Sequence, residues 1–326
     1  MLYHIAFPVY LFMRADEKLQ NRYVDPHIQL KDSDLIGNLT FHDGFPVFGL
    51  VEFNIWGACN RRCAFCPISD PTIFSSRKEG IELSDYEKVL SDLEAIDYSG
   101  VILWSMFSEP TLHKDLSLLV QITKRVLPNV SLQLTSNGDW FLHNEDKFRE
   151  LFDLGIDRVN LSLYDGPEQT VEFSAMRRRC GLTTNQVKLR RRYWADGNFG
   201  ITISNRTGLV DSNAYRDKSE SPITNLPLNK TCYYPFYQVG IDYQGDVLLC
   251  PHDWSKKLIA GNAFKGNLWE IWKGPHFRRA RKNLAAANRS FPPCQTCDVA
   301  GDLGGQKNFD AFCEVPNRLL DRQPKT

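Results

Sequence analysis

Residues 50–55 read LVEFNI and are followed, three residues later, by CNRRCAFC at residues 59–66, and these two runs decide the fold. The first run is apolar and β-rich, which is typical of a buried strand. The second run holds Cys59, Cys63 and Cys66. Ligands of parallel sheets bind at the carboxyl ends of the strands, so we expect these thiols to lie at the functional edge of a sheet.

Strand and helix patterns alternate downstream of this loop. Amphipathic patterns predict a helix that begins with a capping box at Ser84 and ends near Gly100. Further helices are expected at 115–126, 146–154 and 185–194, and further strands at 101–104, 131–134, 159–163 and 199–203. Repeated strand–helix units form right-handed βαβ connections. The expected fold class is α/β, with a parallel sheet that curves into a partial (βα)6-type barrel.

The last third of the chain has a different pattern. Residues 208–230 are rich in Asn, Ser, Asp and Pro, which predicts a linker with a domain boundary near residue 225. A β-hairpin is expected at 238–249, followed by a helical stretch from Leu268 to about Ala287. The expected parts are an N-terminal extension at 1–48, a barrel at 49–225 and a small domain of a β-hairpin plus helix at 226–326.

Composition and charge exclude several classes of protein. The chain has 326 residues, of which 42% are hydrophobic and 24% charged, as in packed globular proteins. Its 39 basic residues balance 39 acidic ones, so we expect no nucleic-acid partner and no anionic membrane surface. The apolar stretch at 1–13 contains His4 and is shorter than the roughly 20 residues that span a bilayer. We therefore expect a cytoplasmic location.

Nine cysteines without an export signal favour metal or redox chemistry over disulfides. The three thiols of the first cluster are one ligand too few to saturate an iron–sulfur cluster or a tetrahedral zinc site, so one coordination position stays open. A zinc site completed by a remote His or Cys is the alternative. A second set supplies four thiolates, which saturate a cluster, although their spacing also allows zinc: Cys232, Cys250, Cys294 and Cys297.

At these residues the chain resembles the radical S-adenosylmethionine (SAM) superfamily, whose hallmark is CxxxCxxC with an aromatic residue before the last cysteine, here Phe65. The residues Ser108-Glu109-Pro110 resemble the end of that family's Gly-Gly-Glu-Pro turn, with Phe107 and Ser108 in place of both glycines. The resemblance implies SAM bound to a 4Fe-4S cluster on Cys59, Cys63 and Cys66. It also implies contacts to SAM from six further residues: Phe65, Glu109, Ser136, Asn137, Ser162 and Arg178.

The C-terminal motifs resemble the SPASM and Twitch extensions of that superfamily. The hairpin, the Leu268-Trp269-Glu270-Ile271-Trp272 helix start and Cys294-x2-Cys297 follow one another in the expected order. The resemblance implies a second, auxiliary 4Fe-4S cluster on the four-cysteine set. The spacing is most similar to the dehydrogenases of aminoglycoside biosynthesis and the related epimerases.

The resemblance implies an oxidoreductase or epimerase. Its 5′-deoxyadenosyl radical would remove a hydrogen atom from a small carbohydrate or aminocyclitol, and an external donor such as flavodoxin or ferredoxin would supply electrons. Peptide maturation and a non-catalytic zinc module are the alternatives. Cys313 is a candidate hydrogen-atom donor, with a substitute cluster ligand and an inert thiol as its other interpretations. Four residues at or near strand ends are candidate substrate contacts: Tyr164, Arg206, His252 and Asp253.

Overall fold

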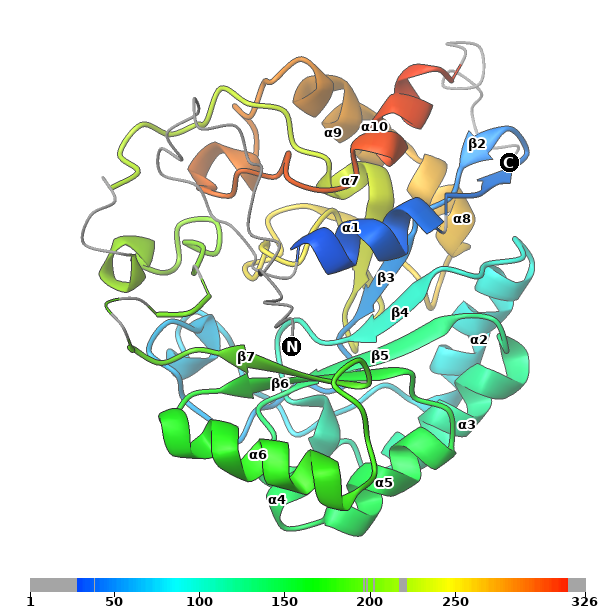
Figure 1. The fold of residues 1–326 in the computed structure, drawn as a ribbon. Helices are drawn as coiled ribbons and strands as arrows, with labels where there is room; N and C mark the ends of the chain where they lie inside the picture. The colour runs from blue at the N-terminus through cyan, green and yellow to red at the C-terminus, as the bar shows by residue number, and fades with distance from the viewer. Residues whose placement is uncertain are drawn as a thin grey trace, which may run out of the picture.

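A parallel sheet forms the centre of the molecule (Figure 1). The structure is a computed structural model that describes residues 28–315 except 38, 196, 198, 202 and 217–221. Within these residues an eight-stranded sheet has the order β10-β9-β8-β3-β4-β5-β6-β7. Its strands are β3 Leu50–Phe53, β4 Val101–Trp104, β5 Ser131–Ser136, β6 Arg158–Leu163, β7 Val187–Arg191, β8 Gln238–Ile241, β9 Asp246–Leu248 and β10 Ile259–Asn262. From β8 to β7 all neighbours pair in parallel, which confirms the expected α/β class with a partial barrel.

Helices cover the outer face of this sheet (Figure 1). They are α2 Leu83–Glu94, α3 Leu116–Val126, α5 Glu145–Asp153 and α6 Pro167–Arg179. Side chains alternate between the two faces of a strand, and the outward ones here, such as Val51, Phe53 and Trp104, are buried against the helices. The remaining helices are α1 Ile28–Gly37, α4 Asp139–Leu142, α7 Tyr234–Tyr237, α8 Leu268–Lys273, α9 Pro275–Ala285 and α10 Gln306–Cys313.

The inner face of the sheet carries many polar side chains beside apolar ones such as Leu50, Val101 and Leu103. Side chains of alternate strand positions line a cavity there, among them Glu52, Gln133, Asn160 and Arg190. Barrels whose interior is a packed core fill it with bulky branched residues. The polar side chains therefore indicate a binding site inside the barrel.

Helix α1 closes this cavity at the amino ends of the strands. Lys31 donates to Gln238 Oε1 at 3.1 Å, and Arg158 Nη1 lies 2.8 Å from Asp34 Oδ2. Gln238 and Arg158 begin β8 and β6. Residues 1–48 carried no functional pattern, and within them the structure also describes a short hairpin of β1 Phe41–His42 and β2 Phe45–Pro46.

The prediction of a helix at 185–194 is wrong, because these residues form β7 and pair with β6 over five positions. Alternating Val187, Leu189 and Arg191 fit this pairing, so tertiary contacts override the helix propensity of the Lys, Leu and Arg residues. The described part of 199–203 is not a strand. Helix α6 was not predicted, and α2 begins after Glu82 rather than at a Ser84 capping box.

The sheet runs across the expected boundary near residue 225. The predicted C-terminal hairpin is confirmed as β8 and β9, and β8 also pairs in parallel with β3, placing Val239 opposite Val51. The helical stretch after it is interrupted at Gly274, which separates α8 from α9. The barrel and the C-terminal part therefore share one continuous sheet.

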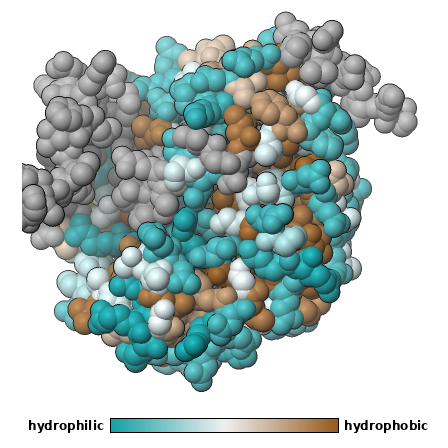
Figure 2. All heavy atoms as spheres, turned by 45° about the vertical axis from the view of Figure 1, so that its right-hand side comes forward, coloured by the Kyte–Doolittle hydropathy of each residue, from teal (hydrophilic) through white to brown (hydrophobic). Residues whose placement is uncertain are grey.

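On the face shown in Figure 2, hydrophobic residues lie in small groups between hydrophilic ones. Among the described residues, no helix has the length and apolar character needed to cross a membrane.

Candidate active site

The first three cysteines lie together in the loop that leaves β3 and line one cavity of about 120 Å³. Burial raises the pKa of the Cys59 thiol to about 12, and nearby Glu109, Cys66 and Cys63 add to the shift. Burial likewise raises the pKa of Cys63 to about 11, with Cys66 contributing. All three cysteines line the same cavity, so the three sulfurs are neighbours. Their number and chemistry fit a 4Fe-4S cluster with one iron left open.

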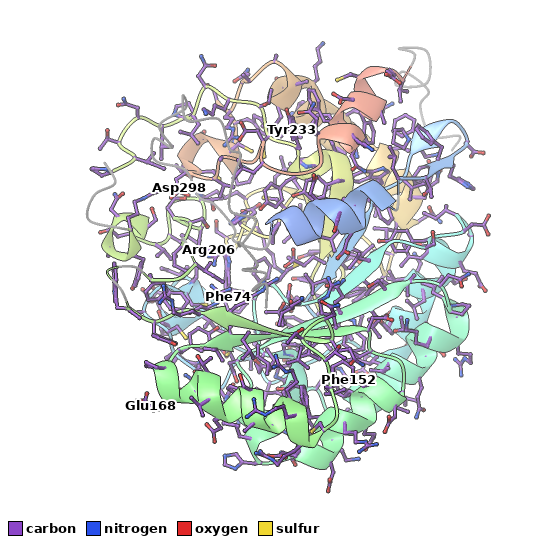
Figure 3. The ribbon with its side chains drawn as sticks, in the orientation of Figure 1. Phe74, Phe152, Glu168, Arg206, Tyr233 and Asp298 are labelled. Atoms are coloured by element: carbon purple, nitrogen blue, oxygen red, sulfur yellow. The ribbon has the colours of Figure 1, made fainter. Side chains whose placement is uncertain are left out.

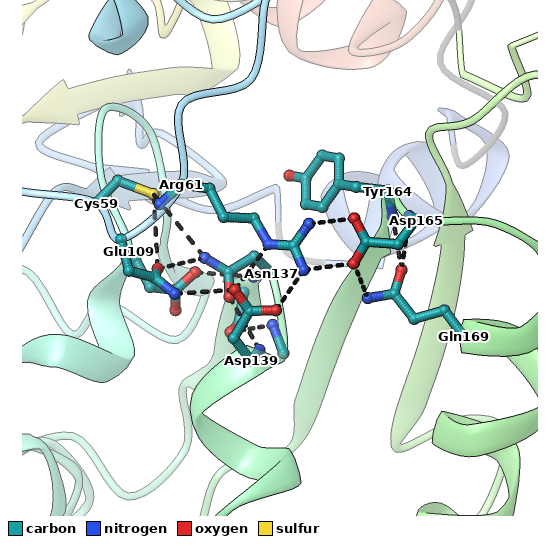
Figure 4. A network of polar contacts seen from close by, with 11 residues as sticks. Cys59, Arg61, Glu109, Asn137, Asp139, Tyr164, Asp165 and Gln169 are labelled. Carbon is teal, nitrogen blue, oxygen red and sulfur yellow. Dashed lines mark hydrogen bonds and ion pairs between the residues drawn. The ribbon is translucent and has the colours of Figure 1, made fainter.

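Arg61, inside the cysteine loop, fixes the loop to the sheet (Figure 4). Its Nε and Nη2 donate to the Asp139 carboxylate at 2.7 and 2.5 Å, and its Nη1 and Nη2 donate to Asp165 at 2.7 and 2.6 Å. Asp139 follows β5 and Asp165 follows β6. Two carboxylates from different strand ends thus hold one guanidinium, and such forked charge-assisted bonds restrict orientation as well as distance.

Glu109 is the acidic residue of the site and is 3% exposed. Its Oε1 accepts from the Thr111 N–H at 3.2 Å, and its Oε2 accepts from the Asn137 N–H at 2.8 Å. Burial raises the pKa of Glu109, while the backbone bond from Asn137 opposes the shift. The loops after β4 and β5 therefore hold the carboxylate beside the cysteines in a single orientation.

The structure brings most of the predicted SAM contacts into this cavity. Phe65, Glu109, Ser136, Asn137 and Ser162 line it together with the three cysteines. Their gathering in one cavity is consistent with the predicted roles.

Aromatic residues that sequence reasoning missed complete one wall of the cavity. The Phe107 and Trp254 rings lie 4.7 Å apart, with Phe74 packed on both. Phe107 was seen only as a replacement for glycine in the turn. The preceding Met106 has a φ of 76°, so this turn bends sharply without a glycine.

Three predicted site residues lie elsewhere. Arg178 is exposed in the last turn of α6, at the edge of the sheet opposite the cysteines, because α6 starts directly after the carboxyl end of β6. Cys313 is exposed at the end of α10 and lines neither cavity. Asp253 is fully buried and accepts the N–H groups of Lys257 and Leu258 at 2.9 and 3.0 Å, so it holds a turn. These positions do not support the roles predicted for them.

The other substrate candidates lie nearer the site. Tyr164 lines the cysteine cavity and stacks on Phe65, with ring centroids 5.9 Å apart. Arg206 and His252 meet, with Arg206 Nη1 3.3 Å from His252 Nδ1. Arg192 follows β7, and its Nε donates to Ser162 Oγ at 3.1 Å. The arginine run at 190–192 was expected to be a solvated face or to supply one ligand to SAM or the substrate, but the helix predicted at 185–194 did not place it at the cavity.

A second cavity of about 200 Å³ lies deeper, on the inner face of the sheet. Glu52 lies in its wall, where it accepts bonds from Ser105 Oγ and, at 2.5 Å, from Gln238 Nε2. Burial raises the pKa of Glu52, against the opposing effect of Lys31. Six residues line both cavities, so the two are adjacent: Ser105, Met106, Thr135, Arg192, Arg206 and Trp254.

The four C-terminal cysteines form a separate site. Burial raises the pKa of Cys250 well above its usual value, and the thiols of Cys294, Cys297 and Cys232 contribute, so the four sulfurs are neighbours. A Cβ atom at Gly301 would lie 2.4 Å from Cys232 Sγ, which leaves room only for glycine. Four thiols in a close backbone cradle fit a saturated iron–sulfur cluster.

Arg289 lies beside these thiols and is 2% exposed. It donates to four backbone carbonyls, from Lys230, Thr231, Val299 and Ala300, at 2.6–2.9 Å. Its charge opposes the burial-driven rise in pKa of Cys232, Cys294 and Cys297. Arg289 thus brings a fixed positive charge to a site built from thiolates. Among the described residues, no three His, Cys, Asp or Glu side chains gather as they would around a single metal ion.

Two family models match this arrangement. Residues 53–191 match the radical SAM superfamily, and residues 232–298 match the SPASM iron–sulfur cluster-binding domain. The second match begins at Cys232 and contains all four cysteines of the second site. The chain therefore carries a radical SAM domain followed by a SPASM domain.

Individual relatives agree with this family. The chain is 26% identical, over 77% of its length and 93% of the relative's, to an S-adenosyl-L-methionine-dependent 2-deoxy-scyllo-inosamine dehydrogenase from Niallia circulans. It is 30% identical to a GTP 3′,8-cyclase from Campylobacter curvus (strain 525.92), over 40% of this chain and 39% of that protein. The structure of BtrN in complex with AdoMet and 2-DOIA has a similar fold, with a TM-score of 0.64 at 23% identity over 78% of this chain and 96% of that one.

The protein is therefore a radical SAM enzyme related to a SAM-dependent dehydrogenase. Its cofactors are SAM and a 4Fe-4S cluster in the radical SAM domain, and the SPASM domain adds auxiliary iron–sulfur cluster binding. This outcome confirms the predicted family and cofactor classes and excludes the non-catalytic zinc module. We propose that Cys59, Cys63 and Cys66 hold the SAM-binding cluster, and that one auxiliary cluster is held by Cys232, Cys250, Cys294 and Cys297.

Proposed function

We propose that this enzyme oxidises an alcohol carbon of a small carbohydrate or cyclitol to a carbonyl. The observation that supports this most is the inner cavity, which lies next to the cysteine cavity and shares six lining residues with it. A substrate there would present a carbon–hydrogen bond to the place where SAM binds. The similarity to an inosamine dehydrogenase over most of both chains supports oxidation of a molecule of this size.

Oxidation of an alcohol carbon removes one hydrogen atom, one proton and one electron. When bound, SAM and the iron–sulfur clusters supply the radical that takes the hydrogen atom and an acceptor for the electron. The protein must supply the proton acceptor. Glu52 is suited to this role because it lies in the cavity wall, and because burial raises its pKa toward the range in which a carboxylate is an effective base.

Oxidation is favoured over epimerisation by the position of Cys313. Inversion of a carbon requires a donor that returns a hydrogen atom from the opposite face. Cys313, the thiol predicted for that role, is exposed on α10 and lines neither cavity.

The electron for SAM cleavage would come from an external donor such as flavodoxin or ferredoxin. We also propose a cytoplasmic location for the reaction.

Anaerobic turnover with SAM, a reductant and a carbon-deuterated cyclitol tests this function. With the deuterated cyclitol, we expect deuterium in 5′-deoxyadenosine. When the unlabelled substrate reacts in deuterated water, we expect a carbonyl product that carries no carbon-bound deuterium. Solvent deuterium on an inverted carbon would contradict oxidation.

The Glu52→Gln variant tests the proton acceptor. It should still transfer the label to 5′-deoxyadenosine, while carbonyl formation falls roughly a hundredfold, the usual loss of a general base. Glu87→Gln, at an exposed carboxylate on α2 that pairs with Arg125, is the matched control and should behave as wild type. Normal carbonyl formation in Glu52→Gln would assign the proton to another group.

A further inference from the structure

The inner cavity carries an excess of positive charge. Among the described residues that line it, five are cationic and two are acidic, an excess of three with His252 counted as neutral. The cations are Lys31, Arg158, Arg190, Arg192 and Arg206, and the acids are Asp34 and Glu52. Buried charge is costly unless opposite charge accompanies it, so this lining favours a ligand that brings negative charge.

The two acids are already matched by cations. Arg158 Nη1 lies 2.8 Å from Asp34 Oδ2. Among the cations that lower the pKa of Glu52, Lys31 has the larger effect, ahead of Arg206. Beyond these two pairs, the lining carries Arg190, which lies within β7, and Arg192 and Arg206, which follow β7 in the chain. Arg192 and Arg206 supply the positive charge next to the cysteine cavity.

Arg192 and Arg206 line both cavities. Arg192 bonds Ser162 and lowers the pKa of Cys63 and Cys66, so it faces the SAM side. The charge of Arg206 lowers the pKa of both Cys66 and Glu52, so Arg206 lies between the cysteine loop and the inner cavity. In Figure 3 it lies between the sheet and the region around Asp298. One SAM carboxylate would match only one of these charges.

Arg206 has hydrogen-bonding capacity to spare. Its Nη1 meets His252 Nδ1 at 3.3 Å, whereas its Nε is buried without a hydrogen-bond partner among the described residues. Its backbone has a φ of 49°, a conformation that a non-glycine residue adopts only when its surroundings hold it there. A guanidinium held in this way presents its fork to a carboxylate or phosphate.

We propose that the substrate carries an anionic group, a phosphate or a carboxylate, which Arg206 and the neighbouring cavity arginines bind. This inference rests on the proposed oxidation and names the substrate class for it. It also separates this enzyme from an inosamine dehydrogenase, because an aliphatic amine is protonated at neutral pH and the excess positive charge would repel it.

Calorimetry on the anaerobic holoenzyme with SAM bound and its clusters unreduced tests the proposal. The probes are myo-inositol, myo-inositol 1-phosphate, an inosamine, glucose, glucose 6-phosphate and glucuronate. We expect at least one anionic probe to bind tenfold or more tightly than its neutral parent, and the phosphate and carboxylate arms identify which group is preferred. Equal or tighter binding of the neutral sugars or of the inosamine would overturn the proposal.

Arg206→Gln should weaken the preferred anion at least tenfold and leave neutral sugars unchanged, whereas Arg206→Lys should retain part of the preference. Arg125→Gln, an exposed arginine on α3 that pairs with Glu87, is the matched control. Iron content and SAM affinity report on folding, and the comparison of probes on the wild-type protein stands even if a variant misfolds. Because these measurements need no turnover, their failure leaves the proposed oxidation intact, and failure of SAM cleavage would not alter them.

Discussion

At the residue level, the buried carboxylate of Glu109 lies in the cavity of the first three cysteines, where we propose that it contacts SAM. Both of its oxygens accept N–H donors, from Thr111 and Asn137. Glu109→Gln keeps the shape but turns one acceptor into a donor that faces another donor. A lost charge-assisted bond costs about 1.5–3 kcal/mol, so SAM affinity should fall roughly tenfold to a hundredfold.

Equilibrium binding of SAM to the anaerobic, iron-loaded Glu109→Gln variant measures this effect. Iron content should remain at the wild-type level, because Glu109 is not a cluster ligand. Unchanged SAM affinity would mean that the Phe107 and Ser108 turn holds SAM through other groups.

Arg289 is the corresponding residue at the auxiliary site, where one guanidinium donates to four carbonyls beside four thiols. Arg289→Gln removes its charge, so the reduction potential of the auxiliary cluster should become more negative by something on the order of tens of millivolts. Arg289→Lys keeps the charge but not the fork. It should hold the potential near wild type while retaining less iron. Electron paramagnetic resonance during a redox titration gives the potential, and identical values in both variants and wild type would leave Arg289 a purely structural role.

At the scale of single residues, the sequence could predict chemistry but not position. The spacing of the cysteines and Glu109 was sufficient because each stands in a loop directly after a strand. Arg178 was chosen as a basic residue after the fourth predicted strand of the barrel, and Cys313 as the surplus cysteine behind the cluster ligands. The structure puts both on exposed helix ends. Glu52 left a signal that was not used, since an acidic residue in a run of buried apolar residues requires a polar partner.

At the scale of elements, Arg61 joins the cysteine loop to the ends of β5 and β6. Arg61→Gln would leave the Asp139 and Asp165 carboxylates facing each other without the guanidinium between them. The loop should then lose its fixed position, and iron bound by the first three cysteines should decrease severalfold while auxiliary iron is kept. Iron analysis and the rate of reductive SAM cleavage measure the two effects.

Arg62 provides the matched control in the same loop. Its exposed side chain donates only to the backbone oxygens of Cys59 and Arg61. Arg62→Gln should therefore retain iron and SAM cleavage. Equal losses in both variants would show that the loop tolerates no change of charge and that the carboxylate pair has no special part.

The elements that the sequence predicted well are those with strong local patterns. The strands β3 to β6, the helices α3 and α5 and the C-terminal hairpin lie within a few residues of their expected positions. Strand β7 failed because Lys188, Leu189 and Arg190 favour a helix locally, and only pairing with β6 decides otherwise. That error also left the position of Arg192, and hence the cationic side of the cavity, unpredicted.

At the scale of the whole molecule, two features arise only from long-range packing. Helix α1 closes the barrel from the amino ends of the strands, and β8 joins the C-terminal part to β3. Neither contact has a sequence signature, because each joins segments separated by many intervening residues. Together these contacts place the auxiliary site and the inner cavity in one folded unit. Because helix packing and strand pairing hold this unit together, loss of one cluster should leave the protein structure around the other in place.

The triple variant Cys59→Ala, Cys63→Ala and Cys66→Ala tests this independence. The two cysteine sets come from different loops, and the described contacts of the C-terminal set include Gly301 and Arg289 but none of the first three cysteines. We expect about half of the iron to remain, since each site fits one four-iron cluster. Reductive cleavage of SAM should be abolished, because only the first site leaves a coordination position open. Retained cleavage would assign the active cluster to the C-terminal site, and complete loss of iron would show that the two clusters assemble together.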